Sequence, residues 1–110
     1  LVVLDDVSLQ IERGQNAAIV GPSGCGKSTL LNILGVLDPP TSGTLTIDGV
    51  NPFKLKETEQ ARFRNDRIGF VFQDHHLLPQ WNVLENTLLP TLAQGSPDSS
   101  AVKRAKDLLE

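Results

Sequence analysis

Alternating patterns and short apolar runs predict strands in several parts of this chain. Val7, Leu9 and Ile11 alternate with polar neighbours, which is the period of a half-buried strand. Residues 17–20 and 68–72 are instead short, compact apolar runs, a pattern typical of strands buried on both faces. The sequence therefore predicts a sheet that contains two buried strands.

Turn residues separate these runs and predict one further pair of strands. Residues 13–14 (Arg-Gly) and 41–43 (Thr-Ser-Gly) are expected to reverse the chain. Leu45 and Ile47 then alternate with threonines, and residues 48–49 (Asp-Gly) follow as another turn. An alternating run that ends at Asp-Gly favours an antiparallel strand pair.

Helical spacing of apolar residues predicts helices between and after the strands. Apolar residues at positions 30, 33, 34 and 37 predict a helix that begins near Lys27 and ends at glycine and proline, and residues 56–67 are expected to form a polar surface helix. A capping box opens a third helix over residues 82–92, which Pro90 is expected to kink, and a fourth begins near Ser99. Strands alternating with helices predict an α/β fold.

Composition limits the class of protein and its partners. The chain has 110 residues, 39% of them hydrophobic and 21% charged, which is ordinary for a globular domain. A net charge of −3 gives nucleic acid no overall attraction, so no nucleic-acid partner is expected. No apolar run is long enough to span a bilayer. Because the chain begins at Leu1, contains no methionine and ends within a helical pattern, we expect it to be a piece of a longer protein.

Residues 21–28 match the P-loop pattern G-x-x-x-x-G-K-[ST], and they lie between a predicted buried strand and a predicted helix. Glycines let the backbone approach an anion, and successive N–H groups with the helix N-terminus form an anion-binding concavity. Lys27 is expected to contact the β- and γ-phosphates, Ser28 to bind Mg²⁺, and Thr29 to reach the α-phosphate. The predicted cofactors are therefore ATP and Mg²⁺, and the fold is that of a P-loop NTPase. The predicted phosphate-binding residues are Gly21, Pro22, Ser23, Gly24, Cys25, Gly26, Lys27, Ser28 and Thr29.

Three candidate residues leave alternatives open. Cys25 is the single cysteine, so it forms no internal disulfide; its position either tolerates a small side chain or holds a redox-sensitive thiol near a helix N-terminus. Gln73 and Asp74 follow the second apolar run, where P-loop enzymes place a metal-binding carboxylate. Asp74 is one candidate, but we favour Gln73, because an amide can contact metal and also orient water.

Several of these motifs together resemble the ATP-binding subunit of ABC transporters. The resemblance includes the loop at residues 21–29, the turn at 41–43 and the pair 72–73, and it covers essentially the whole chain. Residues 72–79 and 84–86 look like the lipoprotein-releasing type, with the macrolide-export and cell-division types close to it. The chain is therefore similar to the N-terminal half of such a subunit.

The resemblance implies a function for each part of the chain. Residues 1–72 would form the P-loop core with an antiparallel β-subdomain, and residues 73–110 the Q-loop and the start of the helical subdomain. Gln73 would be the Q-loop glutamine, a catalytic residue with Lys27 and a metal contact with Ser28. A transmembrane permease would dock its coupling helix near residues 73–79.

The resemblance also implies a location, a dimer and missing parts. The protein would lie peripherally at the cytoplasmic face of the bacterial inner membrane, where a second ATP-binding subunit completes an ATP sandwich. The signature motif, the Walker B carboxylates, the catalytic glutamate, the switch histidine and the adenine-stacking aromatic residue would lie outside this chain. The chain alone is therefore expected to bind ATP without turning it over. The adjacent His75 and His76 would lie near the permease, or are simply solvated loop residues; metal binding by them is not expected, because no third ligand is evident.

Two functions of other classes share the phosphate loop. A P-loop small-molecule kinase would need an arginine-bearing lid, for which Arg62, Arg64 and Arg67 are candidates. Their place on a polar helix just before a buried strand fits a solvated helix face better. A nucleotide-binding module without catalysis is the third reading, and it describes a chain that lacks the remaining motifs.

Overall fold

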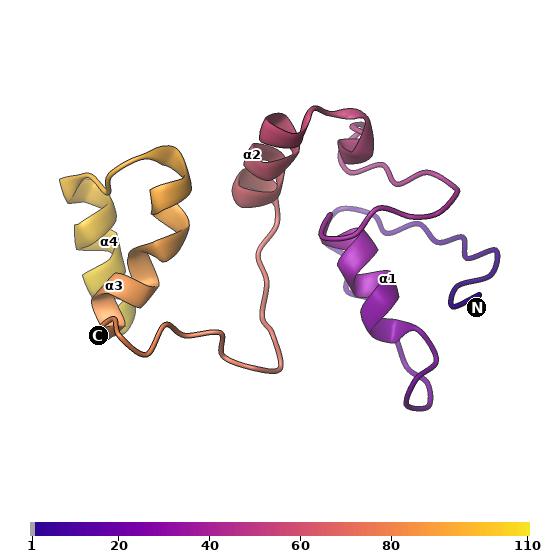
Figure 1. Cartoon of the computed structure of the whole chain (residues 1–110), viewed down its shortest axis with the longest axis horizontal. Helices are drawn as coiled ribbons and strands as arrows, with labels where there is room; N and C mark the ends of the chain where they lie inside the picture. The colour runs from indigo at the N-terminus through magenta and orange to yellow at the C-terminus, as the bar shows by residue number, and fades with distance from the viewer. Residues whose placement is uncertain (1) are drawn as a thin grey trace. The chain divides into compact units, whose positions relative to one another are not determined.

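The computed structural model describes residues 2–110, and these residues form helices joined by long extended segments (Figure 1). The chain divides into two compact units, Leu1–Gln60 and Ala61–Glu110, each with its own local packing. None of the helices among residues 2–110 is long and apolar enough to cross a membrane. In chain order the helices are α1 (Lys27–Leu34), the 3-10 helix η1 (Pro52–Lys54), α2 (Glu57–Arg67), α3 (Val83–Leu88), the 3-10 helix η2 (Leu89–Gln94) and α4 (Ser99–Leu109).

Helix α1 is the centre of the first unit and confirms the helix predicted after the glycine-rich loop. It begins after Gly26, which has a left-handed backbone with φ of 93°. It ends at Gly35, whose N–H donates to the carbonyl of Leu31 at 2.8 Å. Val36 follows with only 1% of its surface exposed, so the end of α1 supplies the buried apolar contact of this unit.

No sheet is present among residues 2–110, so the strand predictions at 7–11, 17–20, 44–47 and 68–72 are not confirmed by this structure. One isolated antiparallel bridge joins Ile47 to Val50 around the predicted turn at 48–49. The physical reason is pairing, because a strand is stabilised by the N–H and C=O groups of a neighbour. The apolar runs specify an extended backbone, but among residues 2–110 no hydrogen-bonded ladder pairs them.

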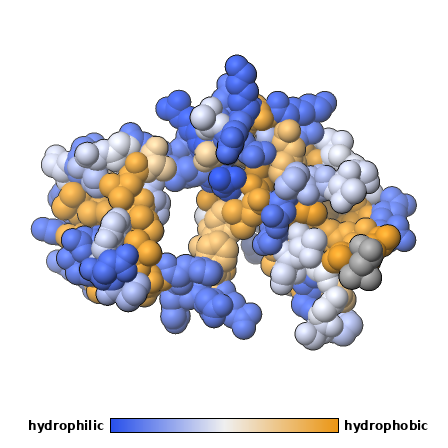
Figure 2. Space-filling view, viewed as in Figure 1, coloured by the Kyte–Doolittle hydropathy of each residue, from blue (hydrophilic) through white to orange (hydrophobic). Residues whose placement is uncertain are grey.

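Side chains of these unpaired segments are consequently at the surface rather than in a core. Val20 in the first unit is 87% exposed, and Val71 in the second is fully exposed. Figure 2 shows hydrophobic residues at the surface of both units. The prediction that residues 17–20 and 68–72 are buried on both faces is therefore also wrong for this structure.

The helices of the second unit follow their sequence signals closely. The predicted capping box is confirmed, since the Asn82 side chain accepts from the N–H of Glu85 at 2.9 Å and the Glu85 carboxylate accepts from the N–H of Asn82 at 2.8 Å. Pro90 lies at the start of η2, so the predicted helix changes from α to 3-10 geometry there. Helix α4 packs against α3 and buries Ala105.

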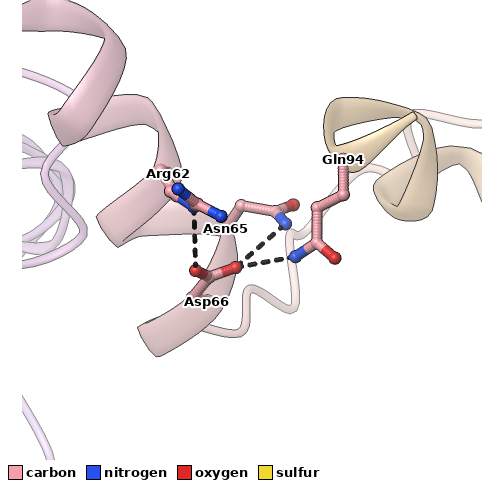
Figure 3. A network of polar contacts seen from close by, with 4 residues as sticks. All are labelled: Arg62, Asn65, Asp66 and Gln94. Atoms are coloured by element: carbon pink, nitrogen blue, oxygen red, sulfur yellow. Dashed lines mark hydrogen bonds and ion pairs between the residues drawn. The ribbon is translucent and has the colours of Figure 1, made fainter.

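Polar side chains connect α2 to η2 within the second unit (Figure 3). Asp66 accepts a hydrogen bond from the Gln94 side chain at 2.8 Å, across 28 residues of sequence. Arg62 lies one turn earlier on α2, with its Nε 3.9 Å from an oxygen of Asp66. Arg62 therefore forms an ion pair along its own helix, as the reading of α2 as a solvated surface helix predicts.

Candidate phosphate-binding site

The predicted P-loop forms a glycine-rich turn that leads directly into α1. Gly24 and Gly26 have positive φ values of 78° and 93°, which L side chains rarely adopt. The N–H of Cys25 donates to the carbonyl of Pro22 at 3.4 Å and closes the turn. A Cβ on Gly21 would lie 2.7 Å from the Cys25 sulfur, so a side chain there would have to displace this thiol.

Lys27 reaches back over this loop from the first position of α1. Its Nζ donates to the carbonyls of Gly21 at 2.9 Å and Pro22 at 2.7 Å. The same Nζ lies 3.7 Å from the sulfur of Cys25. Two backbone carbonyls therefore hold the ammonium group at the loop, and phosphate oxygens can replace them with stronger charge-assisted hydrogen bonds.

The N-terminus of α1 supplies the remaining attraction for an anion. No side chain caps the helix, and its first turn contains no acidic residue. The first turn of α1 itself therefore supplies no carboxylate that would compete for its N–H groups and the positive end of the helix dipole. Ser28 and Thr29 lie exposed in this turn, where their hydroxyls are accessible to a phosphate or a cation.

A tight contact with the N-terminal segment fixes the start of α1. A Cβ on Gly26 would lie 3.0 Å from the carbonyl oxygen of Val3 and 3.0 Å from a methyl carbon of Leu4. Sequence analysis gave Val3 and Leu4 no role, because no local pattern indicates a contact between segments more than twenty residues apart. The segment at residues 3–4 therefore supports the phosphate loop from outside its motif.

The residues present fit the way Mg²⁺ binds beside a nucleotide. No group of three His, Cys, Asp or Glu side chains among residues 2–110 could hold a metal ion. Mg²⁺ usually keeps several waters and takes one or two protein ligands with substrate phosphates, so such a group is not required. The Ser28 hydroxyl is exposed in the first turn of α1 and is available for such a contact, and its binding of Mg²⁺ stays a prediction.

Gln73 lies in the second unit, directly after the extended segment 68–72. Its neighbourhood is aromatic: the ring of Phe72 stacks on Phe70 at 5.2 Å and meets His76 edge-on at 4.7 Å. Gln73 and Asp74 are both exposed. Because the phosphate loop belongs to the first unit, the metal and water contacts of Gln73 stay predictions.

Two open grooves flank Trp81 in the second unit. The first has a volume of about 310 Å³ and lies between the segment at residues 77–81 and the exposed side of α3. The second, of about 320 Å³, lies between Trp81 and the side chains of Leu88 and Leu92. The first groove begins four residues after Gln73, in the part of the chain where the family resemblance places the permease contact.

The chain matches known proteins over nearly its full length. A family model described as ABC transporter matches residues 4–110. A lipoprotein-releasing system ATP-binding protein, LolD 1 of Rhodopirellula baltica, is 57% identical over 110 residues, which are 100% of this chain and 48% of that protein. LolD of Bacteroides fragilis is 48% identical over 110 residues, which are 100% of this chain and 51% of that protein.

The backbone of this chain is also similar to that of a solved structure. The ATP-binding cassette MJ0796, described as dimeric and bound to ADP and Pi in a post-hydrolysis state, superposes with a TM-score of 0.85 at 43% identity. The match covers 97% of this chain and 47% of that one. The chain thus spans about half the length of the proteins it matches.

Proposed function

Because this chain belongs to the ABC transporter family, we propose that its full-length protein is an ATPase subunit that powers a membrane transporter. The observation that carries the proposal is the P-loop geometry, with Lys27 folded over a turn of backbone amides at the start of α1. The LolD names of the relatives support lipoprotein release as the transport reaction. The superposition with a cassette bound to ADP and Pi supports nucleotide at this loop.

The chain supplies one part of the hydrolytic site. The loop amides and Lys27 bind the β- and γ-phosphates and neutralise charge that builds up as the terminal phosphoryl group leaves. Ser28 and Gln73 would hold Mg²⁺, which would supply positive charge beside the phosphates. Gln73 also orients the attacking water. A second copy of the subunit, bound head to tail, completes the site, as the dimeric state of the neighbour supports.

The second unit carries the contact with the transporter. We assign residues 73–79 and the groove that follows them to a cytoplasmic coupling helix of a transmembrane permease. Leu77 is 65% exposed and Val83 66% exposed at this groove, which gives an amphipathic partner an apolar surface to cover. The subunit is then held at the cytoplasmic face of the inner membrane by its partner.

The family match disfavours the small-molecule kinase as an alternative. A kinase of this class needs arginines aimed at an acceptor, whereas Arg62 lies in an ion pair on the surface of α2. The chain alone, without the other half of the family's sequence, fits a nucleotide-binding module that does not turn over ATP.

The proposal is tested with the full-length protein and its permease in lipid nanodiscs. Wild-type protein should hydrolyse ATP, and the permease should change the rate. Gln73→Ala should bind ATP with nearly unchanged affinity, because the loop holds the phosphates, and should hydrolyse it at a much reduced rate. Asp74→Asn, which alters the adjacent rejected candidate, serves as the matched control. Equal losses of binding and turnover in Gln73→Ala would show that Gln73 is structural, and phosphorylation of a small acceptor would favour a kinase.

A further inference from the structure

The side chain of Asn86 makes an unusual number of hydrogen bonds to the backbone. Its Oδ1 accepts from the N–H of Leu78 at 2.8 Å. Its Nδ2 donates to the carbonyls of Leu78 at 3.1 Å, Trp81 at 3.1 Å and Asn82 at 3.0 Å. An amide nitrogen has two hydrogens, so one of them is shared between two of these carbonyls. One side chain on α3 thus holds both peptide groups of Leu78 and the end of the following turn.

These contacts define one wall of the first groove beside Trp81. The segment at residues 78–81 is a turn closed by its own hydrogen bond, from the N–H of Trp81 to the carbonyl of Leu78 at 3.1 Å. Leu77, Pro79 and Trp81 line the groove from this side. Val83 lines it from α3, and Asn86 lies between the two sides. The Asn86 hydrogen bonds therefore set the separation between the turn and the helix.

We propose that Asn86 is a positioning residue that holds this groove open at the width of an apolar segment of the permease. The inference rests on the proposed function, and it adds the residue that shapes the docking surface. Asn86 is half-buried and is held by four backbone groups, so a partner would contact mainly Leu77 and Val83 at the rim. The apolar rim and the polar base fit an amphipathic helix that presents two or three apolar side chains.

The test separates docking from positioning by photo-cross-linking the full-length protein in cells. A benzophenone amino acid in place of Val83 should cross-link to the permease, because this position is 66% exposed at the groove. The same probe in place of Leu108, which is 69% exposed on α4 and lines neither groove, is the matched control. If the Val83 probe does not capture the permease in otherwise unaltered protein, the docking part of the proposed function fails.

Asn86→Asp then tests the positioning role. This substitution keeps an oxygen that accepts from the N–H of Leu78. It replaces the Nδ2 donor by a second oxygen, which then faces the carbonyls of Leu78, Trp81 and Asn82. The Val83 cross-link should fall by about tenfold, the effect expected from losing one or two net hydrogen bonds. ATP affinity should stay near wild type, and the protein should stay folded, although the lost hydrogen bonds lower its thermal midpoint by a few degrees. Asn82→Asp is the matched control, because aspartate caps α3 as well as asparagine does and should leave the cross-link unchanged.

Three results would overturn the inference while leaving the docking site intact. The first is an undiminished cross-link in Asn86→Asp. The second is an equal loss in Asn82→Asp, which would indicate a charge effect. The third is a loss of ATP binding and of the folded state in both Asn86→Asp and Asn86→Ala, which would show that Asn86 stabilises the whole domain rather than one groove.

Discussion

At the scale of single residues, Lys27 shows that the loop holds a positive charge in place before a nucleotide binds. Its ammonium group is within 2.9 Å of the Gly21 carbonyl and 2.7 Å of the Pro22 carbonyl. These neutral partners keep the charge at the loop without cancelling it. The ammonium group is therefore already in place when a phosphate binds, and Lys27 needs only a small rearrangement to contact it.

Replacement of this lysine gives the first residue-scale prediction. Lys27→Ala in the full-length protein removes a charge-assisted contact worth roughly 1.5–3 kcal/mol. ATP affinity should therefore fall by about tenfold to a hundredfold in an equilibrium titration. Lys54→Ala, which removes an equal charge from an exposed position of η1, should bind like wild type. An unchanged affinity in Lys27→Ala would remove Lys27 from the site.

The two left-handed glycines of the loop give a second prediction, because their surroundings differ. Alanine at either position costs about 1–2 kcal/mol for the left-handed backbone. Gly24 has open space around a Cβ, whereas Gly26 would place one 3.0 Å from the Val3 carbonyl. Gly26→Ala should therefore lower the unfolding free energy of the full-length protein more than Gly24→Ala does, as measured by urea titration. Equal losses would mean that residues 3–4 do not constrain the loop.

At the scale of elements, α4 depends on a titratable cap. Asp98 accepts from the N–H of Ala101 at 2.8 Å and from the Ser100 hydroxyl at 2.7 Å. These hydrogen bonds, the backbone one foremost, lower the pKa of Asp98 below its usual range. Because the pKa of Asp98 is lower in the folded than in the unfolded protein, the charged carboxylate stabilises the fold. This stabilisation is fully present above the unfolded pKa of about 3.9, and it is lost as the pH falls through the folded pKa.

The prediction compares wild type with Asp98→Asn, which keeps a cap but cannot titrate. At pH 6 the thermal midpoint of wild type should be equal to or higher than that of Asp98→Asn, because the charged cap also interacts favourably with the helix dipole. Between pH 6 and pH 3 the wild-type midpoint should fall further than that of Asp98→Asn, measured by circular dichroism. Because other carboxylates titrate in both proteins, the difference isolates Asp98. A difference that is independent of pH would contradict the assigned cap.

Elements were predictable from the sequence where their determinants are local. The P-loop helix, the polar helix α2 and the capping box at Asn82 each depend on residues within one or two turns, and all three form as predicted. The sheet was not predictable in this way, because a strand requires a partner segment that its own residues do not specify. The same distinction applies to the site: the loop motif identified Lys27, whereas the support from Val3 depends on a long-range contact.

At the scale of the whole molecule, the main discrepancy is that apolar runs typical of buried strands are exposed to solvent. Val20 and Val71 are almost completely exposed, although their runs have the composition of buried strands. The matched relatives are about twice as long as this chain. We therefore expect residues 17–20 and 68–72 to pair with strands from the rest of the full-length protein, where the apolar side chains would become part of a core.

Val71→Thr tests this expectation without changing side-chain shape or strand propensity. If Val71 is buried in the full-length protein, the hydroxyl has to enter an apolar site, which costs about 1–3 kcal/mol in the free energy of unfolding. If Val71 stays exposed, the change should be within about 0.5 kcal/mol, as for other surface positions. Val83→Thr, the same substitution at the groove rim, is the matched control and should have this small effect. Urea titration of the three full-length proteins measures both changes. A small effect at Val71 would mean that the run is exposed in the complete domain as well, and the phosphate loop would then lack the sheet expected to hold it.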